Sequence, residues 1–324
     1  MISLRYHIVS LVAVFLALAL GIVVGSTVLQ EGTVSVLRAT GERVRQESEK
    51  NSRENVALKQ EKARLEAFGA AFLPELVQGR LKGRPVVLVD TDKVDSGLRE
   101  TVRKALEDAG AEVDGQVTFS DQHLALANEA DRTAVGRLLG ADAGAPEVLR
   151  DTLVKRVADR LVTSSAIPQE DGQRPSDLLT SLQDADFLAD LKLSKPITAG
   201  TGPFPRQGST FVLLGPSPAA APTAVAPDAF LVPLADQVSS RASGSGAVAG
   251  VEAAAVPGPN SWVQALRNDR EVSRRVSGID SVDTVYGQFS LVEALQTSLQ
   301  QGPAGQYGTK DGARALFPEP TVGS

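Results

Sequence analysis

The first hydrophobic feature of the chain is an uninterrupted apolar run near its N-terminus. Residues 8–29 read IVSLVAVFLALALGIVVGSTVL and contain no charged side chain. At about 1.5 Å per residue, a helix of this length crosses a hydrocarbon core of roughly 30 Å. A cleaved signal peptide is the alternative, but the Ala-x-Ala at residues 17–19 lies inside the run instead of after it. We therefore predict an uncleaved signal anchor at 8–29.

The charges around this run bear on its orientation. Arg5 precedes the run and Glu31 follows it, which favours a short cytoplasmic segment, 1–7, and an extracytoplasmic remainder. Arginines at 38, 43 and 45 favour the opposite orientation, because the positive-inside rule counts Lys and Arg near both ends of a span. We expect a single-pass protein of the cell membrane with its bulk outside the cytoplasm.

Small residues recur every four positions along one face of the predicted span. They are Ala13, Ala17, Gly21 and Gly25, and the last two form a G-x-x-x-G motif. Such a face lets two helix backbones approach closely in lipid and favours dimers. The alternative is that Gly and Ala are simply common in membrane helices.

The segment 31–73 has no proline, many charges and a partial heptad repeat. Half of the predicted seam is apolar, and the other half is Gly, Ser, Asn or Lys. The apolar seam residues are Val34, Leu37, Val44, Leu58, Leu65 and Phe72. This pattern predicts a parallel coiled-coil stalk, with a lone amphipathic helix as the alternative. Pro74 is expected to end the helix or to mark a hinge into the next domain.

Beyond the stalk, apolar runs alternate with helical periodicity. Strands are predicted at 86–90, 112–119, 210–215, 229–234, 247–251 and 279–284. Helices are predicted at 95–109, 128–139, 147–162, 175–191, 260–268 and 290–299, the last capped by Ser290. The alternation indicates an α/β domain at 80–300, a Rossmann-like, mostly parallel sheet with helices on both faces and a helical insertion near 128–192. Residues 301–324 are expected to form a Gly/Pro-rich tail.

Composition removes several kinds of chemistry. The chain has no Cys, one Met and two His, so thiolate metal sites and cysteine nucleophiles are excluded. Its net charge is -6 and aromatic residues make up 4%, which is not the composition of a nucleic-acid-binding surface. We therefore expect no nucleic-acid partner.

One acidic motif follows the first predicted strand. Asp90 and Asp92 frame Thr91 at the place where doubly wound sheets bind ligands, and two carboxylates could hold a divalent cation. The simpler interpretation is an aspartate that caps the following helix, with Asp95 or Ser96 sharing the role.

A second candidate pair is Asp121 and His123, after the second predicted strand. His123 could be a base or a metal ligand, although a single loop histidine is more often solvated. A Ser-His-Asp triad has only this histidine outside the N-terminal segment, and no G-x-S-x-G, G-x-G-x-x-G or P-loop motif occurs. We predict a protein that is not an enzyme and has no cofactor.

Three segments resemble the actinobacterial MctB family. They are MISLRYHIVSL at 1–11, LALGIVVG at 18–25 and GQYG at 305–308. The order of span, coiled coil and α/β domain is similar as well, so the resemblance covers essentially the whole chain. It implies a role in copper homeostasis or copper transport, as an outer-membrane, channel-forming protein that keeps intracellular copper low. A corynebacterial relative implies a different role in daughter-cell separation, with a partner protein that controls peptidoglycan hydrolase activation.

The residues themselves offer copper few ligands. Copper(I) prefers Cys or Met sulfur and copper(II) prefers clustered imidazoles, neither of which this chain provides. We therefore expect a membrane-anchored, non-catalytic homodimer or higher homo-oligomer that serves copper homeostasis by binding an envelope or division protein. The alternatives are a cell-separation regulator and a metal-dependent enzyme at Asp90 and Asp92.

Overall fold

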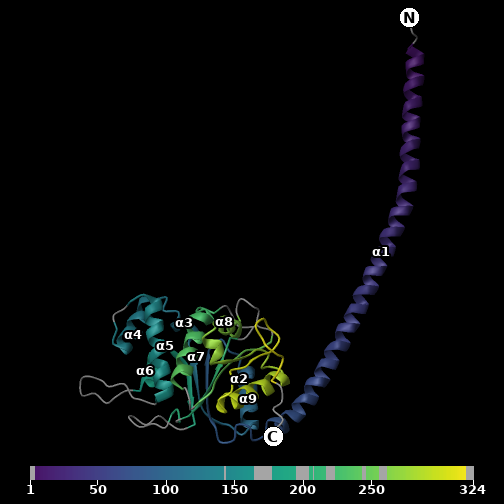
Figure 1. The fold of residues 1–324 in the computed structure, drawn as a ribbon. Helices are drawn as coiled ribbons and strands as arrows, with labels where there is room; N and C mark the ends of the chain where they lie inside the picture. The colour runs from purple at the N-terminus through teal and green to yellow at the C-terminus, as the bar shows by residue number, and fades with distance from the viewer. Residues whose placement is uncertain are drawn as a thin grey trace. The chain divides into compact units, whose positions relative to one another are not determined.

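A computed structural model of the chain describes residues 4–141, 144–163, 177–194, 204–206, 208–216, 223–242, 246–254 and 261–318. The chain forms two units, residues 1–65 and residues 66–324. The first unit is helical, and the second contains a sheet with helices around it (Figure 1).

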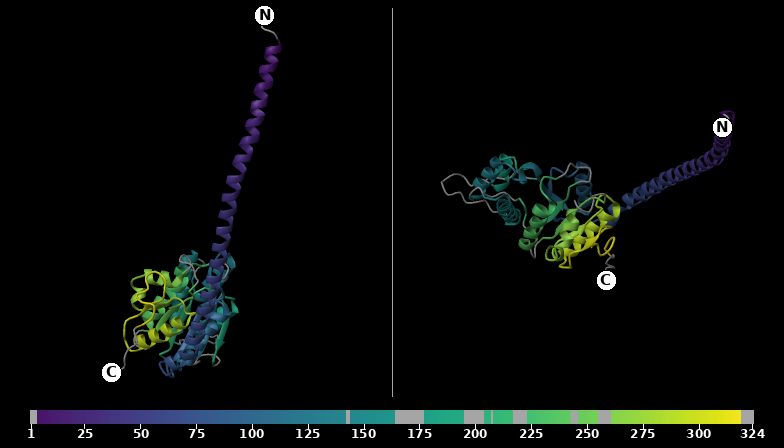
Figure 2. Two further views of the ribbon diagram at one scale, coloured as in Figure 1. Left: turned by 90° about the vertical axis from the view of Figure 1, so that its right-hand side faces the viewer. Right: turned by 90° about the horizontal axis from the view of Figure 1, so that it is seen from above.

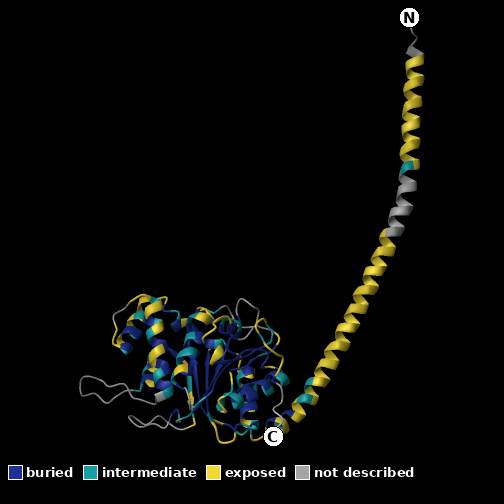
Figure 3. Ribbon diagram, viewed as in Figure 1, coloured by how far each residue is buried: buried dark blue, intermediate teal, exposed yellow. Residues whose placement is uncertain are grey.

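Helix α1, Leu4–Val77, begins in the first unit and supplies its whole described structure. Its segment Tyr6–Gly25 is long and apolar enough to cross a membrane, and this fits a single-pass anchor. The described side chains of this unit are exposed almost throughout (Figure 3).

The described residues predicted to pair two chains are therefore not packed against other parts of the chain. Ala17 is exposed, and a Cβ added at Gly21 or Gly25 would meet no atom within 4 Å. The stalk residues Leu37, Val44, Leu58 and Leu65 are all at least 61% exposed. The side chain of Val34 lies outside the described residues, and pairing of two chains stays a prediction.

The last turns of α1 belong to the second unit. The helix does not end at Pro74 but continues to Val77, because Leu73 and Val77 are buried in the core of the domain. Just beyond the helix, Arg80 Nε donates to the carbonyl oxygen of Leu76 at 2.9 Å, which satisfies one of the free carbonyls at the helix end.

The second unit is built on a seven-stranded sheet with the order β3-β2-β1-β4-β5-β6-β7. Its strands are β1 Pro85–Thr91, β2 Glu112–Phe119, β3 Leu188–Leu193, β4 Thr210–Leu214, β5 Val248–Val251, β6 Ser277–Ile279 and β7 Gln306–Tyr307. All neighbours pair in parallel except β2 and β3, which are antiparallel. The predicted mostly parallel α/β fold is confirmed, whereas a coiled coil is not shown.

Helices cover both faces of this sheet (Figure 2). One face carries α3 Asp121–Leu124, α4 Glu129–Leu139, α5 Pro146–Thr163, α6 Leu178–Asp184, α7 Pro227–Arg241 and α8 Trp262–Asn268. The other face carries the end of α1, α2 Ser96–Asp108 and α9 Val285–Leu299. Strand β1 shows why both faces are apolar, since Val87 and Val89 point to the first layer and Val86 and Leu88 to the second.

Two predicted elements were wrong in type. The predicted helix 175–191 is α6 followed by β3, because Asp186 adopts a positive φ of 62° and ends the helical path. Part of its beginning, residues 175–176, lies outside the described residues. The predicted strand 229–234 is the middle of α7, whose start is marked by Pro227 at the first turn and by Asp228.

Other boundaries differ near the C-terminus. The predicted strand 279–284 is the earlier and shorter β6, which is followed by a loop at Asp280 and Ser281 because Ser281 adopts a positive φ of 69°. A short 3₁₀ turn, η2, spans Val272–Arg274 and precedes β6.

Helix α9 begins at Val285, where Thr284 caps it. The predicted cap, Ser290, instead donates to the carbonyl of Tyr286 inside the helix. Strand β7 continues the sheet beyond residue 300.

The single tryptophan fixes two neighbouring strands. Trp262 is fully buried, and its Nε1 donates to the carbonyl oxygen of Val251 at 2.9 Å. Its ring lies on Gly215 and Gly250, where an added Cβ would stand 1.8 Å and 2.5 Å from ring atoms. A side chain at either glycine is therefore incompatible with this ring position.

We expect Gly215→Ala to destabilise the domain by about 3 kcal/mol, because overpacking must displace Trp262. Denaturant unfolding followed by the fluorescence of this tryptophan measures the loss. Gly97→Ala adds the same methyl group where only the rotatable Asp95 carboxylate is near, and it should cost less than about 1 kcal/mol. Equal stability of Gly215→Ala and wild type would contradict this packing.

Candidate functional site

The strand order reverses between β1 and β4. From β1 the chain moves outward through β2 to β3, and from β4 it moves the other way through β5 to β6. In open α/β sheets, ligands bind outside the carboxyl ends of the strands at such a switch point. The residues that follow β1, β2 and β4 here are Asp92, Asp121 and Pro216.

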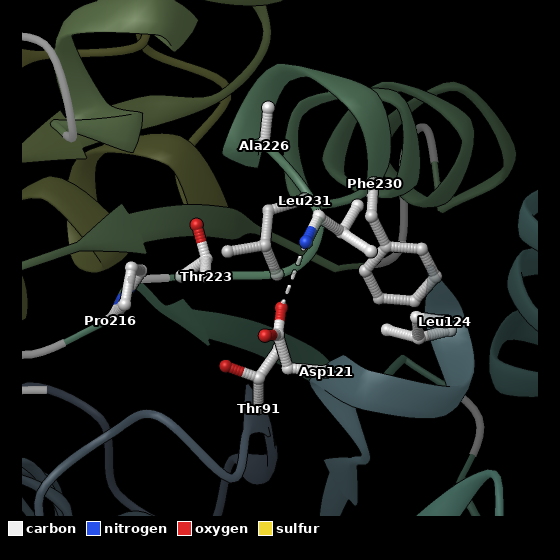
Figure 4. A pocket seen from close by; sticks show the side chains of 9 residues that line it. Thr91, Asp121, Leu124, Pro216, Thr223, Ala226, Phe230 and Leu231 are labelled. Atoms are coloured by element: carbon white, nitrogen blue, oxygen red, sulfur yellow. Dashed lines mark hydrogen bonds between the residues drawn. The ribbon is translucent and has the colours of Figure 1, made fainter. Parts of the chain in front are cut away.

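A small cavity marks this position (Figure 4). Thr91, Asp121, Leu124, Pro216, Thr223 and Phe230 are among the residues that line it. Its volume is about 10 Å³, which is room for one water molecule. As lined by the described residues, this cavity is too small for a nucleotide.

Asp121 explains how the crevice is closed. Its carboxylate is buried and accepts hydrogen bonds from the backbone amides of Ala224 at 2.6 Å and Val225 at 3.3 Å. Its own amide donates to Oδ1 of Asp92 at 3.2 Å. The carboxylate thus holds Ala224 and Val225, just before α7, at the switch point.

Asp90 and Asp92 do not form a pair. Asp90 lies inside β1 and contacts Arg99 of α2, whereas Asp92 lies beyond the end of the strand and accepts from the amide of Asp121. Oδ2 of Asp90 accepts from Nε of Arg99 at 2.6 Å and from Nε2 of Gln116 at 3.2 Å. Its Oδ1 is buried without a hydrogen-bond partner in the described part of the chain.

The buried position of Asp90 changes its acidity. Burial raises the pKa of this carboxyl above 3.8, and it outweighs the hydrogen bond to Thr118 and the charge of Arg99, which both lower the pKa.

Asp95, and not Asp90 or Asp92, caps helix α2. Its Oδ1 accepts from the amides of Gly97 and Leu98.

His123 turns away from Asp121. Its Nδ1 lies 2.9 Å from Oδ1 of Asp131, and its ring packs 5.7 Å from that of Phe187. Asp131 in turn exchanges hydrogen bonds with Asn128 at the start of α4. Within the described ranges, no three His, Asp or Glu side chains gather where they could hold a metal ion.

A buried polar network, which the sequence did not predict, lies at the carboxyl ends of β6 and β7. Asp280 accepts from Arg267, from the amides of Thr309 and Lys310 and from the Ser281 hydroxyl, at 2.8–3.2 Å. Burial raises the pKa of Asp280, but these hydrogen bonds and the charge of Arg267 together lower it below 3.8.

Gly308 is required at this network. A Cβ there would lie 2.2 Å from the Asp280 carboxyl group, and its φ is +131°. This contact gives a physical reason for the last glycine of the GQYG segment. The GQYG segment at 305–308, which carries part of the family resemblance, was the sequence signal in this region.

Glu252 forms the second half of the network. Its Oε1 accepts from Nζ of Lys310 at 2.7 Å and from the Ser261 hydroxyl. Each buried carboxylate at this edge is therefore paired with a cation or a hydroxyl, an arrangement that holds residues 306–310 to the sheet.

Comparison with known proteins identifies relatives of the whole chain. A family model described as "Copper transport outer membrane protein, MctB" matches residues 1–318. A protein of Mycobacterium tuberculosis (strain ATCC 25618 / H37Rv) named "Copper transporter MctB" is 26% identical over 330 residues, which cover 98% of this chain and 99% of that protein. A protein of Mycobacterium leprae (strain TN) with the same name is 27% identical over 334 residues, with the same shares covered.

The raised pKa of Asp90 leads to a prediction on pH dependence. A carboxyl that binds its proton more tightly when folded contributes stability that is lost as pH rises from about 3.8 through the raised value. Asp90→Asn removes this contribution. The variant should therefore lose more stability relative to wild type near pH 4 than at pH 7, in denaturant unfolding at each pH.

Asp184→Asn supplies the same change of charge at an exposed position and serves as the control. A difference between Asp90→Asn and wild type that stays constant from pH 4 to pH 7, or grows with pH, would contradict the assignment.

Proposed function

This chain belongs to the MctB family, and we propose that it serves copper homeostasis in the cell envelope as a non-catalytic, dimeric scaffold that binds a partner protein. The family match over residues 1–318, which includes both the apolar helix and the domain, carries the copper-related envelope role. The relatives are named for copper transport, and this chain takes that role here as a proposal. Its N-terminus would be cytoplasmic and its domain extracytoplasmic.

A scaffold fits the domain better than a resident copper site does. The four candidate ligands have other partners, since Asp121 binds backbone amides, Asp90 binds Arg99 and His123 contacts Asp131. Asp92 accepts from the amide of Asp121. The chain has no Cys and only the initiator Met, so soft sulfur ligands for copper(I) are lacking. Copper would then be handled through a partner protein.

The separation of Asp90 from Asp92 also disfavours a divalent-cation enzyme. The two carboxylates bind different groups and have no common partner among the described contacts. A regulator of cell separation would use the same anchor and stalk, so it remains the alternative scaffold function.

The stalk supports pairing of two copies. From Leu37 to Phe72 its apolar seam residues are separated by multiples of seven, which is the repeat of a left-handed coiled coil, and Val34 lies three residues before the first of them. The same heptad register continues past residue 73 to Leu76, which is 55% exposed. Two copies anchored in one membrane would present these residues at the same height.

The described end of α1 has two different apolar faces. One face packs on its own domain, where Leu73 and Val77 are buried and Glu66 accepts from the amide of Val285 at 3.3 Å. The other carries Phe68 and Phe72, which are 66% and 46% exposed, with ring centroids 4.7 Å apart. An exposed aromatic pair next to a docked face favours a protein contact, and a second copy supplies the matching stripe.

Single-cysteine variants test the dimer, because the chain has no cysteine of its own. Leu58→Cys and Leu65→Cys should each form a disulfide-linked dimer in oxidised membranes, since seam positions bring the two sulfur atoms within bonding reach. Gln60→Cys lies on the opposite side of the helix and is the control. Non-reducing gels measure the dimer, and equal dimer from all three variants would contradict a specific seam.

A deletion strain tests the copper role. Loss of the gene should raise intracellular copper, and the full chain should restore the wild-type level. A Leu58→Asp, Leu65→Asp double variant should fail to restore it, because charges disrupt the seam, whereas Gln60→Asp should succeed. Unchanged copper content and copper sensitivity in the deletion strain would contradict the proposed function.

A further inference from the structure

A second and much larger cavity opens at the amino edge of the sheet. It lies where β1, β5 and β6 begin and where α7 and α9 end. Its volume is about 540 Å³, within the range of pockets that hold small molecules. Polar side chains in its wall include Ser239, Ser298 and Gln301.

The charge of this cavity is opposite to that of the chain. Among the described residues that line it, Arg84, Arg274 and Arg275 are cationic and none is acidic. The chain as a whole has 39 acidic and 33 basic residues. A cluster of three arginines without a lining carboxylate is therefore a local exception that an anion would complement.

The arginines are only partly neutralised by residues outside the wall. Arg274 pairs with Glu271 at 3.0 Å, but both side chains are exposed, so water screens this pair. Arg275 pairs with Asp236. Arg84 has no ion pair in the part of the chain that the structure describes, and its guanidinium remains available to a ligand.

The C-terminal ends of two helices, α7 and α9, lie beside these arginines. The free carbonyl groups of such an end favour cations, so they help to hold the guanidinium groups in place. At α9 the amides of Gln300, Gln301 and Gly302 donate to carbonyls of the last turn, and at α7 the amide of Ala242 donates to the carbonyl of Val238. These bonds satisfy part of the free carbonyls and so reduce the negative charge that an anion would meet.

We propose that this cavity binds a small organic oxyanion, recognised through its carboxylate or phosphate groups by Arg84, Arg274 and Arg275. The planar guanidinium fork matches both groups, and the side-chain amide of Gln301 in the wall supplies a neutral hydrogen-bond donor beside them. The site lies at the opposite edge of the sheet from the closed switch point and does not depend on the proposed copper role.

Titration calorimetry on the full chain in detergent micelles tests this site, with citrate and inorganic phosphate as the probes. At least one probe should bind saturably, and Arg84→Gln should weaken its binding about tenfold, because a charged hydrogen-bonding group is lost. Arg274→Gln is a second variant that should weaken the same probe. Binding of citrate alone indicates a carboxylate ligand, and binding of phosphate alone indicates a phosphate ligand.

Arg137→Gln, on the exposed surface of α4, is the matched control and should bind the probe as wild type does. Tryptophan fluorescence should show an unchanged unfolding midpoint for Arg84→Gln without the probe. The proposal is overturned if neither probe saturates, or if Arg84→Gln and Arg274→Gln bind like wild type. Equal weakening in Arg137→Gln would also overturn it, because the attraction would then be general.

Discussion

The burial of the last turns of α1 is the constraint on which the second unit depends. Leu73, Val77 and Leu81 complete the apolar layer that also contains β1, α2 and α9. Arg80 strengthens this junction, since its guanidinium pairs with the buried Glu293 and donates to Gln296 at 3.0 Å. A helix whose first part is long and apolar enough to cross a membrane therefore ends as part of a domain core. Folding of the domain and completion of this helix are one process, because neither apolar surface is covered without the other.

The buried carboxylates of the domain bind groups of the same chain and so connect its segments. Asp121 closes the switch point through two backbone amides, and Asp280 and Glu252 fix the C-terminal segment through Arg267 and Lys310. A carboxylate with this many donors has little capacity left for a metal ion or substrate. This is the physical basis for proposing a scaffold within a family that is named for copper transport. The cationic cavity at the other edge is a different case, because its charges exceed their partners.

The sequence predicted elements whose signal is local and missed those fixed by distant contacts. Unbroken apolar runs at 86–89 and 211–214 correctly indicated buried parallel strands. Helix α7 was mistaken for a strand because it is apolar on several sides, packed among α5, α8 and the sheet. Edge strand β3 carries Asp190 and Lys192 and so has no strand-like apolar run. Asp121 was identified as a candidate, but its partners are backbone amides of Ala224 and Val225, which leave no trace in a sequence.

Copper binding by the purified full chain distinguishes a scaffold from a copper carrier. Calorimetry with metal analysis would compare wild type with His123→Ala, under conditions that hold copper first as copper(I) and then as copper(II). Because His123 is engaged with Asp131 and the carboxylates have other partners, the account predicts no stoichiometric binding in either protein. Tight one-to-one binding in wild type that is lost in His123→Ala would contradict it and would make the chain itself a copper carrier.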